Sequence, residues 1–492
     1  MHGRLLRSVV GLLALLAAGL VQADVRHAVV QVFNQSREVN FQYPWQNGNI
    51  ASSYGTGVII AGNRILTNAH VVDNSVQLQV RKVGSDRKYQ AQVAFISDER
   101  DLAMITVNDP DFFRDTEIME LGALPMLGDE VTTYGFPVGG TQLAITRGIV
   151  SRIDYDYYAH SGYQNLVCQI DAAINPGASG GPAIVNGRLA GLNFQGLGNA
   201  DNVGYIIPPP VIEAFLKDIE DGKVHGVPEI AFVLQPTENP QLRQRYGLEE
   251  NGGGVLVTSL SGLEKEKGLL QVGDVVVSID GQLLGNDNTV RFVTADRIDS
   301  NILIARRQVG EKLPLTVIRG GKKFDIDYPL TYTLKDARIV PGHQSNLLPE
   351  YEVIGGLVLV EISDDLMRGW KFIPPAVDQQ RLEYRRTGSD TVDRLLMVVN
   401  VLPDEINRGY EKSRFGIVET VNGVKVSNIA QVREQLNKPD GDYVVLGFAP
   451  HDIQVTFSRK ALAERMPVIA ERYGIKPREE LVPAPAGPAS TR

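Results

Sequence analysis

Short runs of β-forming residues, separated by Gly, Asn and Asp, fill the chain from about residue 25 to residue 215. They include GTGVIIAG, RILTNA, VQLQVRKV, DEVTTYGF, GIVSRI and VGYIIP. Many short strands with turn signals between them are typical of an all-β barrel or sandwich. Three prolines, 208–210, then precede VIEAFLKDIED, whose apolar residues have the spacing of one helix face. We therefore expect a mainly β domain that ends with one helix.

Two later parts of the chain share one order of strand-like runs. GGVLVTSL at 253–260 precedes GDVVVSIDGQLL at 273–284, and GGLVLVEI at 355–362 precedes FGIVETVNGVKV at 415–426. Each second run contains Asp-Gly or Asn-Gly, the strongest short turn signal. The shared order predicts a duplicated module. A length of 492 residues also favours about three domains.

Residues 1–23, MHGRLLRSVVGLLALLAAGLVQA, have the three parts of a secretory signal peptide. Arg4 and Arg7 are followed by an apolar run and by the small-residue ending Val21-Gln22-Ala23. The apolar run is shorter than the roughly 20 residues that a membrane-spanning helix needs. We predict an exported protein, periplasmic or secreted, with no stable membrane span; the alternative is a buried N-terminal helix. The end of the chain, PAPAGPASTR, lacks large apolar residues and is expected to be disordered.

The composition excludes several kinds of partner and cofactor. A net charge of −9 provides no basic surface for nucleic acid. The sequence has neither a Cys/His cluster that would indicate a metal site nor a glycine-rich phosphate loop that would indicate ATP binding. We therefore expect no cofactor. Cys168 is the only cysteine, so no intrachain disulfide forms; it is expected to be a small buried apolar residue, a reactive thiol being the alternative.

Three residues have the identities and the order of a hydrolytic triad. His70 stands in ILTNAHVV, Asp101 directly precedes the apolar run LAMITV, and Ser179 lies in DAAINPGASGGPAI. A serine hydroxyl is a poor nucleophile until a histidine takes its proton, and that histidine needs an acidic partner. The order His, Asp, Ser matches the chymotrypsin-type arrangement on two β-barrels. Each residue alone also fits a structural role in a turn or at a strand end.

The segments GTGVIIAGNRILTNAHVV, DLAMITV, YGFPVGG, TRGIVSRI and DAAINPGASGGPAI resemble those of the HtrA/Deg (protease Do-like) serine endopeptidases. The resemblance implies a chymotrypsin-like double β-barrel followed by two PDZ-like α+β domains, of which the second is divergent. The predicted units are a signal peptide at 1–23, a protease domain at 24–222, PDZ domains at 223–340 and 341–470, and a tail at 471–492.

By position in that family, Ser179 is the nucleophile, His70 the general base and Asp101 the residue that orients it. The backbone N–H groups of Gly177 and Ser179 would form the oxyanion hole, where each donor contributes about 3–4 kcal/mol. The family usually has Asn where this chain has Ala178. Because the oxyanion donors are backbone groups, we expect this change to leave a functional but more mobile loop.

The resemblance also points to a specificity pocket lined by Ile174 and Leu197, both apolar, so a small aliphatic residue before the scissile bond is preferred over Arg or Lys. Core packing is the alternative for Ile174. The candidate carboxylate-binding loop of the first PDZ domain is Glu229 followed by Ile230, Ala231 and Phe232. Its glycines are replaced, so this domain is expected to contact a neighbouring subunit instead of a peptide.

The segment FQYPWQ, with Phe41, Tyr43 and Trp45, precedes the protease motifs. An aromatic surface arm of this kind predicts either a subunit interface, as in trimer-based family members, or packing against the barrel. The function predicted from all these features is ATP-independent cleavage of unfolded or damaged proteins by an acyl-enzyme mechanism. The alternative is a chaperone or PDZ scaffold on a protease fold with little proteolytic activity.

Overall fold

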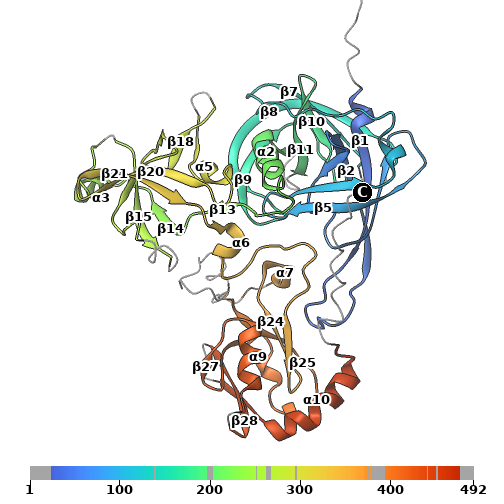
Figure 1. Ribbon diagram of the computed structural model, residues 1–492, viewed down its shortest axis with the longest axis vertical. Helices are drawn as coiled ribbons and strands as arrows, with labels where there is room; N and C mark the ends of the chain where they lie inside the picture. The colour runs from blue at the N-terminus through green and yellow to red at the C-terminus, as the bar shows by residue number, and fades with distance from the viewer. Residues whose placement is uncertain are drawn as a thin grey trace, which may run out of the picture.

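The computed structural model describes residues 24–137, 140–196, 203–250, 252–261, 268–293, 296–368, 370–371, 373, 377, 394–439, 441–449 and 453–476. The predicted signal peptide and the last residues of the predicted tail lie outside this part. Two closed barrels form the N-terminal half, and two larger sheets and two short strand pairs follow them in the described part of the chain (Figure 1). The mainly β architecture that the sequence predicts is confirmed.

The first barrel has six antiparallel strands in the order β1-β2-β3-β6-β5-β4. Apolar residues of these strands point inward and pack on Phe112, which is fully buried. The strands are β1 (Val29–Arg37), β2 (Ile50–Ile60), β3 (Arg64–Thr67), β4 (Ser75–Lys82), β5 (Tyr89–Ser97) and β6 (Leu102–Val107), with 3₁₀ turns at Val25–Ala28 and Pro110–Phe113.

The second barrel, in the order β10-β11-β12-β9-β8-β7, repeats this design. In β7, Val131, Thr133 and Gly135 are buried while the residues between them are more exposed, as expected for strands with one face in the core. Its elements are β7 (Glu130–Gly135), β8 (Ala144–Tyr157), β9 (Gln164–Ile170), β10 (Pro182–Val185), β11 (Arg188–Gly196), β12 (Gly204–Ile207) and the closing helix α2 (Pro209–Asp218). Cys168 lies fully buried in β9, and burial raises the pKa of its thiol to about 12, so it is the predicted inert core residue.

A smaller unit follows α2, with the sheet order β14-β15-β16-β20-β21 and β17 beside β16. Its strands are β14 (Phe232–Gln235), β15 (Val255–Leu260), β16 (Val275–Ile279), β17 (Gln282–Leu283), β20 (Lys312–Arg319) and β21 (Lys322–Pro329). Two short pairs, β13 (Pro228–Glu229) with β22 (Tyr332–Thr333) and β18 (Thr289–Arg291) with β19 (Arg297–Asp299), and the helices α3 (Pro240–Arg245), α5 (Ile302–Ala305) and α6 (Leu334–Ala337) complete it.

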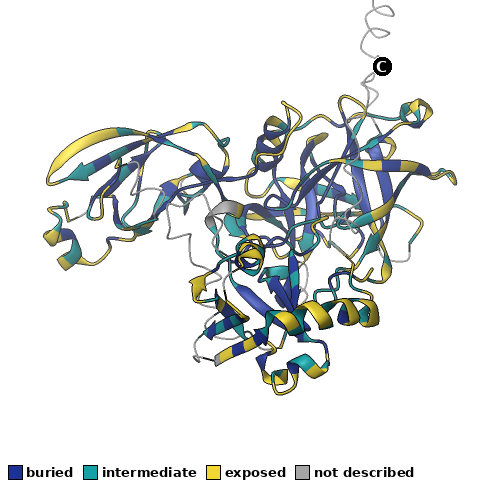
Figure 2. Cartoon of the chain, turned by 60° about the horizontal axis from the view of Figure 1, so that its bottom comes forward, coloured by how far each residue is buried: buried dark blue, intermediate teal, exposed yellow. Residues whose placement is uncertain are grey.

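The C-terminal unit has the sheet order β23-β24-β25-β26-β28-β29, with β27 beside β26. Its elements are β23 (Tyr351–Ile354), β24 (Leu357–Glu361), α7 (Asp364–Met367), β25 (Leu396–Val401), β26 (Ile417–Val421), β27 (Val424–Lys425), α9 (Ile429–Asn437), β28 (Tyr443–Ala449), β29 (Ile453–Ser458) and α10 (Arg459–Tyr473), with 3₁₀ turns at Glu405–Asn407 and Glu411–Ser413. Helix α10 continues past residue 470, where the tail was predicted to begin, and its face away from the sheet is exposed (Figure 2).

Both small sheets contain the hairpin that the dipeptide signals predicted. Asp280 and Gly281 join β16 to β17 with φ values of 51° and 75°, and Asn422 and Gly423 join β26 to β27 with φ values of 52° and 76°. Positive φ at both central residues defines a type I′ turn, which matches the twist of its strands. The same turn therefore joins two paired strands in each of these sheets.

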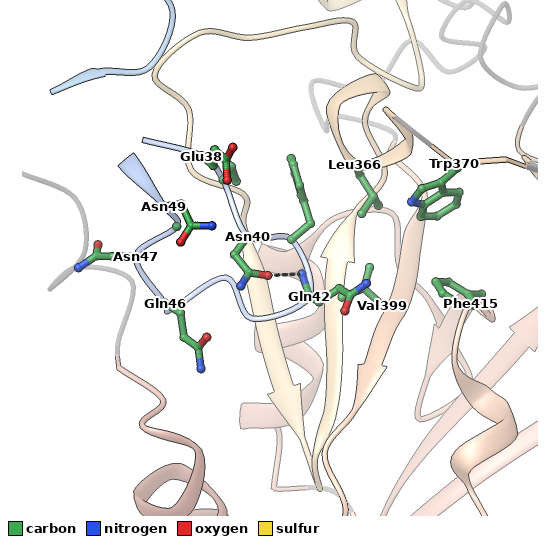
Figure 3. Close-up of a pocket in the computed structure, with 13 residues that line it drawn as sticks. Glu38, Asn40, Gln42, Gln46, Asn47, Asn49, Leu366, Trp370, Val399 and Phe415 are labelled. Atoms are coloured by element: carbon green, nitrogen blue, oxygen red, sulfur yellow. Dashed lines mark hydrogen bonds between the residues drawn. The ribbon is translucent and has the colours of Figure 1, made fainter. Parts of the chain in front are cut away.

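The aromatic segment FQYPWQ lies in the loop between β1 and β2 and packs on the C-terminal unit. Trp45 is 3% exposed, its indole N–H donates to the Tyr473 carbonyl at 2.9 Å, and its ring packs against Tyr351. The expectation of packing on the barrel is therefore wrong, because Trp45 contacts Tyr351 and Tyr473 of the C-terminal unit, while the alternative of a subunit interface stays a prediction. Beside this contact, Asn40 and Gln42 face Trp370 and other residues across a hollow of about 460 Å³ (Figure 3).

Candidate active site

His70 and Asp101 are joined by two hydrogen bonds. His70 follows β3, and its Nδ1 lies 2.7 Å from Asp101 Oδ2, while its backbone N–H donates to Asp101 Oδ1 at 2.9 Å. Asp101 precedes β6, has φ of 48° and is 1% exposed. Asn68 fixes that turn by donating to the Asp101 carbonyl. One carboxylate thus orients both the ring and the backbone of His70.

Ser179 lies in the loop between β9 and β10, held by backbone bonds to both barrels. Its carbonyl accepts from the Thr56 N–H at 2.9 Å, and the following residue, Gly180, donates to the Asn193 carbonyl. Gly180 has φ of 81°, and a side chain there would collide with the Thr56 carbonyl, so glycine is required. Ser179 Oγ donates to the Phe194 carbonyl at 3.3 Å. Within the described residues no hydrogen bond joins Ser179 Oγ to His70, as is common without substrate.

The peptide before Ser179 has a positive φ at Gly177 and is bonded to the first barrel. Gly177 has φ of 94°, and its carbonyl accepts from the Thr56 hydroxyl at 2.8 Å. That hydroxyl also accepts from the Phe136 N–H, which ties the loop to the first barrel. Neither the Gly177 N–H nor the Ser179 N–H donates to another residue in the described part of the chain. Both residues line one cleft, together with His70.

Ala178 is held by its backbone and by contact with β7. Its carbonyl accepts from the Gly181 N–H at 3.0 Å and from Asn193 Nδ2 at 3.4 Å. Its side chain lies against Gly135, where an added Cβ would be 2.7 Å from Ala178. The loop thus has supports that do not require an Asn side chain, and its predicted mobility stays a prediction.

An open cleft of about 780 Å³ surrounds these groups. Ile174 lines this cleft and lies next to Gly204 of β12, and its role in specificity stays a prediction. Leu197, the second predicted pocket residue, lies outside the described residues. The cleft is partly open to solvent.

His160, which the sequence did not single out, stacks on His70. The two rings lie 3.7 Å apart with an interplanar angle of 14°. Burial, followed by the proximity of His70, lowers the pKa of His160 to about 4, so the ring is neutral at neutral pH. No local pattern marks a histidine in the turn between β8 and β9 as an active-site neighbour. Only the closure of the second barrel brings it there.

The segment after α6 contacts both loops that carry the paired residues. His343 Nδ1 lies 2.6 Å from Asp365 Oδ1 and His343 Nε2 lies 3.3 Å from Asp73, three residues after His70. Ser345 donates through its N–H and hydroxyl to Asp98, three residues before Asp101. The sequence showed no sign of this contact, because its partners are distant along the chain.

The candidate carboxylate-binding loop is internally bonded. Ile230 donates its N–H to the Glu229 carboxylate at 2.7 Å, and Ala231 donates to the Tyr328 hydroxyl at 3.2 Å. Ile230, Ala231 and Phe232 are all buried. Burial raises the pKa of Glu229 to about 7. The amides expected to bind a peptide terminus are thus already used.

Among the described residues, no group of His, Cys, Asp and Glu has the geometry of a metal site. No helix in that same part of the chain is long and apolar enough to cross a membrane.

Comparison with known proteins identifies both kinds of domain. Residues 55–192 match the trypsin-like peptidase domain, and residues 340–479 match the PDZ domain. The chain is 36% identical over 416 residues to "Protease Do-like 4, mitochondrial" of Arabidopsis thaliana, covering 83% of this chain and 76% of that one. It is 33% identical over 469 residues to "Protease Do-like 2, chloroplastic" of the same plant, covering 93% and 75%. A solved structure, "HtrA-type protease AlgW with tripeptide", overlaps with 26% identity and a TM-score of 0.49, covering 61% of this chain and 92% of that one.

Extensive identity to several Do-like proteases, a trypsin-like domain of two closed barrels and a PDZ domain occur together in one chain. The protein belongs to the HtrA/Deg (protease Do-like) family of serine endopeptidases.

Proposed function

We propose that this endopeptidase cleaves unfolded or damaged proteins without ATP, with Ser179 as nucleophile, His70 as general base and Asp101 as the residue that orients His70. The observation that carries the proposal is the 2.7 Å contact between His70 Nδ1 and Asp101 in the same cleft as Ser179. A hydrogen bond at Nδ1 leaves Nε2 of the neutral ring as the proton acceptor.

We assign one of these groups to each step of acyl transfer. Ser179 Oγ attacks the substrate carbonyl carbon while His70 Nε2 takes its proton, and the N–H groups of Gly177 and Ser179 stabilise the new oxyanion. His70 then protonates the leaving amine, so the peptide C–N bond breaks and an acyl-enzyme remains. Water attacks that ester by the same route and releases Ser179. Ile174 favours a small aliphatic side chain before the cleaved bond.

The domain arrangement proposed is a protease domain at 24–222, a first PDZ domain at 223–340 and a second at 341–470. The two small sheets support the duplication, since each pairs a type I′ hairpin with its central strands. The internal bonding of Ile230 and Ala231 supports a first PDZ domain that contacts protein surfaces instead of chain ends. A trimer-based homo-oligomer is proposed with it.

For location, the signal-like sequence of residues 1–23 supports export, to a periplasm or outside the cell. The relatives above are named for the mitochondrion and the chloroplast. N-terminal sequencing of the protein purified from its source tests the expected cleavage after Ala23.

The test of function is degradation of unfolded casein by wild type and by Ser179→Ala at equal concentration. We expect loss of at least about 10³-fold in the variant, since only oxyanion and binding effects remain. Equal rates would refute the proposed nucleophile. Suppression of aggregation is measured in parallel: if wild type also fails to cleave yet prevents aggregation, the scaffold or chaperone alternative holds.

A further inference from the structure

His160 covers one face of the His70 ring. The rings are nearly parallel at 3.7 Å, whereas Asp101 contacts His70 at the Nδ1 edge. An imidazole held only at one edge can still swing about its own bonds. The stacked ring restricts that swing, because rotation out of plane would bring the two rings into collision.

The turn that presents His160 is built without using its side chain. The Tyr158 N–H donates to the Tyr163 carbonyl at 2.8 Å, and the Gly162 N–H donates to the Tyr158 carbonyl at 2.8 Å. The Tyr158 hydroxyl donates to the Leu166 carbonyl at 2.6 Å, and Gln195 accepts from the Ala159 N–H. Replacing the imidazole therefore leaves the scaffold of the turn intact.

The surroundings of the His160 ring keep it neutral beside His70, the base that becomes charged during the reaction. His160 lies among His70, Asp101, Arg368 and His343, and burial keeps its pKa near 4. When His70 takes the serine proton, the neighbouring ring carries no charge to repel it. An aromatic face also attracts a cation placed over it, which favours the protonated His70 of the transition state.

We propose that His160 is a positioning residue for the general base: its ring holds the plane of His70 and accommodates the imidazolium formed during acyl transfer. This inference rests on the proposed roles of Ser179 and His70. His160 does not contact the reacting bond and acts through His70. Since it also lines the cleft, a role in substrate contact must be separated from this one.

The test compares His160→Leu, which fills the space without an aromatic face, with His160→Phe, which keeps the stack. Both are made in the full chain beside wild type and Ser179→Ala. Two measurements are made: kcat and KM for a fluorogenic peptide, and the rate of labelling by a small fluorophosphonate. That probe reacts with the activated serine but has no side chains to fill subsites, so its rate reports the serine and its base.

We expect His160→Leu to lower both kcat and the labelling rate on the order of tenfold, less than the 10²-fold that a 1 Å misplacement costs. KM should change by less than about twofold. His160→Phe should stay within about threefold of wild type in both assays, as rescue by a stacked ring requires. Thermal unfolding of both variants checks that the turn is retained.

The inference is overturned if His160→Leu labels at the wild-type rate, if only its KM rises, or if Phe and Leu are equally impaired while both remain folded. These outcomes leave the proposed function intact provided Ser179→Ala is inactive. Labelling or cleavage by Ser179→Ala would instead refute the proposed function itself.

Discussion

His343 joins the C-terminal unit to the loop that follows His70, and its removal should loosen that contact strongly. The residue is 8% exposed and lies between the carboxylates of Asp365 and Asp73. Burial alone would lower its pKa, but the hydrogen bonds to Asp365 and Asp73 raise it to about 10. Arg368, which also pairs with Asp365, and Asp98, which binds Ser345, face the same cluster.

The size of the effect follows from the proton affinity. A pKa of about 10 against 6.5 for a free histidine corresponds to about 5 kcal/mol at 1.36 kcal/mol per tenfold change. A free histidine is mostly deprotonated at pH 7. At this pH, binding of the proton by His343 therefore contributes about 4 kcal/mol to the stability of the docked arrangement. Breaking a buried pair by removing one partner costs about 3–5 kcal/mol, which agrees. We therefore expect His343→Gln to destabilise the docked arrangement by about 3–4 kcal/mol.

The assay is amide hydrogen exchange at Gln344 and Ser345, whose N–H groups donate to Asp365 and Asp98. It is run at pH 7 in a Ser179→Ala background to prevent self-cleavage. Loss of 3–4 kcal/mol should speed exchange about 10²- to 10³-fold if local opening controls it. The control, His225→Gln, removes an exposed pair with Asp221 and should change little.

The contribution of His343 to the docked arrangement decreases as pH rises. The folded pKa of His343 is raised, so its contribution is complete below pH 6.5 and is lost as pH rises through about 10. Tryptophan fluorescence monitors undocking, because Trp45 packs on the C-terminal unit. Two results would refute the reasoning. The first is amide exchange in His343→Gln within about twofold of the rate in the parent protein, and the second is the same alkaline fluorescence transition in both proteins.

Two further substitutions test the packing of the loops. Gly135→Ala would place a Cβ 2.7 Å from Ala178, closer than side chains tolerate, so the loop that carries Ser179 must shift. Casein cleavage should then fall about 10- to 10²-fold, and wild-type activity in the variant would contradict this. Glu229→Gln keeps the acceptor for the Ile230 N–H but cannot ionise. Burial raises the folded pKa of Glu229 to about 7, so wild type loses stability as pH rises from about 4.5 to 7. The variant should therefore be up to about 3 kcal/mol more stable than wild type in urea at pH 8, about 1 kcal/mol more stable at pH 5 and nearly equal below pH 4. An equal difference at all of these pH values would show that the charge is not the cause.

The mainly β class and the two hairpin turns were predictable because local sequence controls them. Short apolar alternations specify strands, and Asp280-Gly281 and Asn422-Gly423 tolerate the positive φ that a type I′ turn requires. The order of His70, Asp101 and Ser179 predicted a shared site, because this order is typical of one way of closing two barrels. His70 Nδ1 lies 2.7 Å from Asp101 and shares a cleft with Ser179, while the roles of all three residues await the experiments above.

Other features depend on contacts between residues that are far apart along the chain. Trp45 donates to the Tyr473 carbonyl, His160 covers His70, and His343 bridges Asp73 and Asp365. No repeating pattern in the sequence predicts such pairs. A long-range contact needs only one suitable residue in each of two segments, and the flanking residues in those segments are left unconstrained. The sequence by itself therefore determined the strands, the turns and the candidate catalytic residues. The tertiary structure decided which distant groups pack on the base, since only chain closure brings their surfaces together.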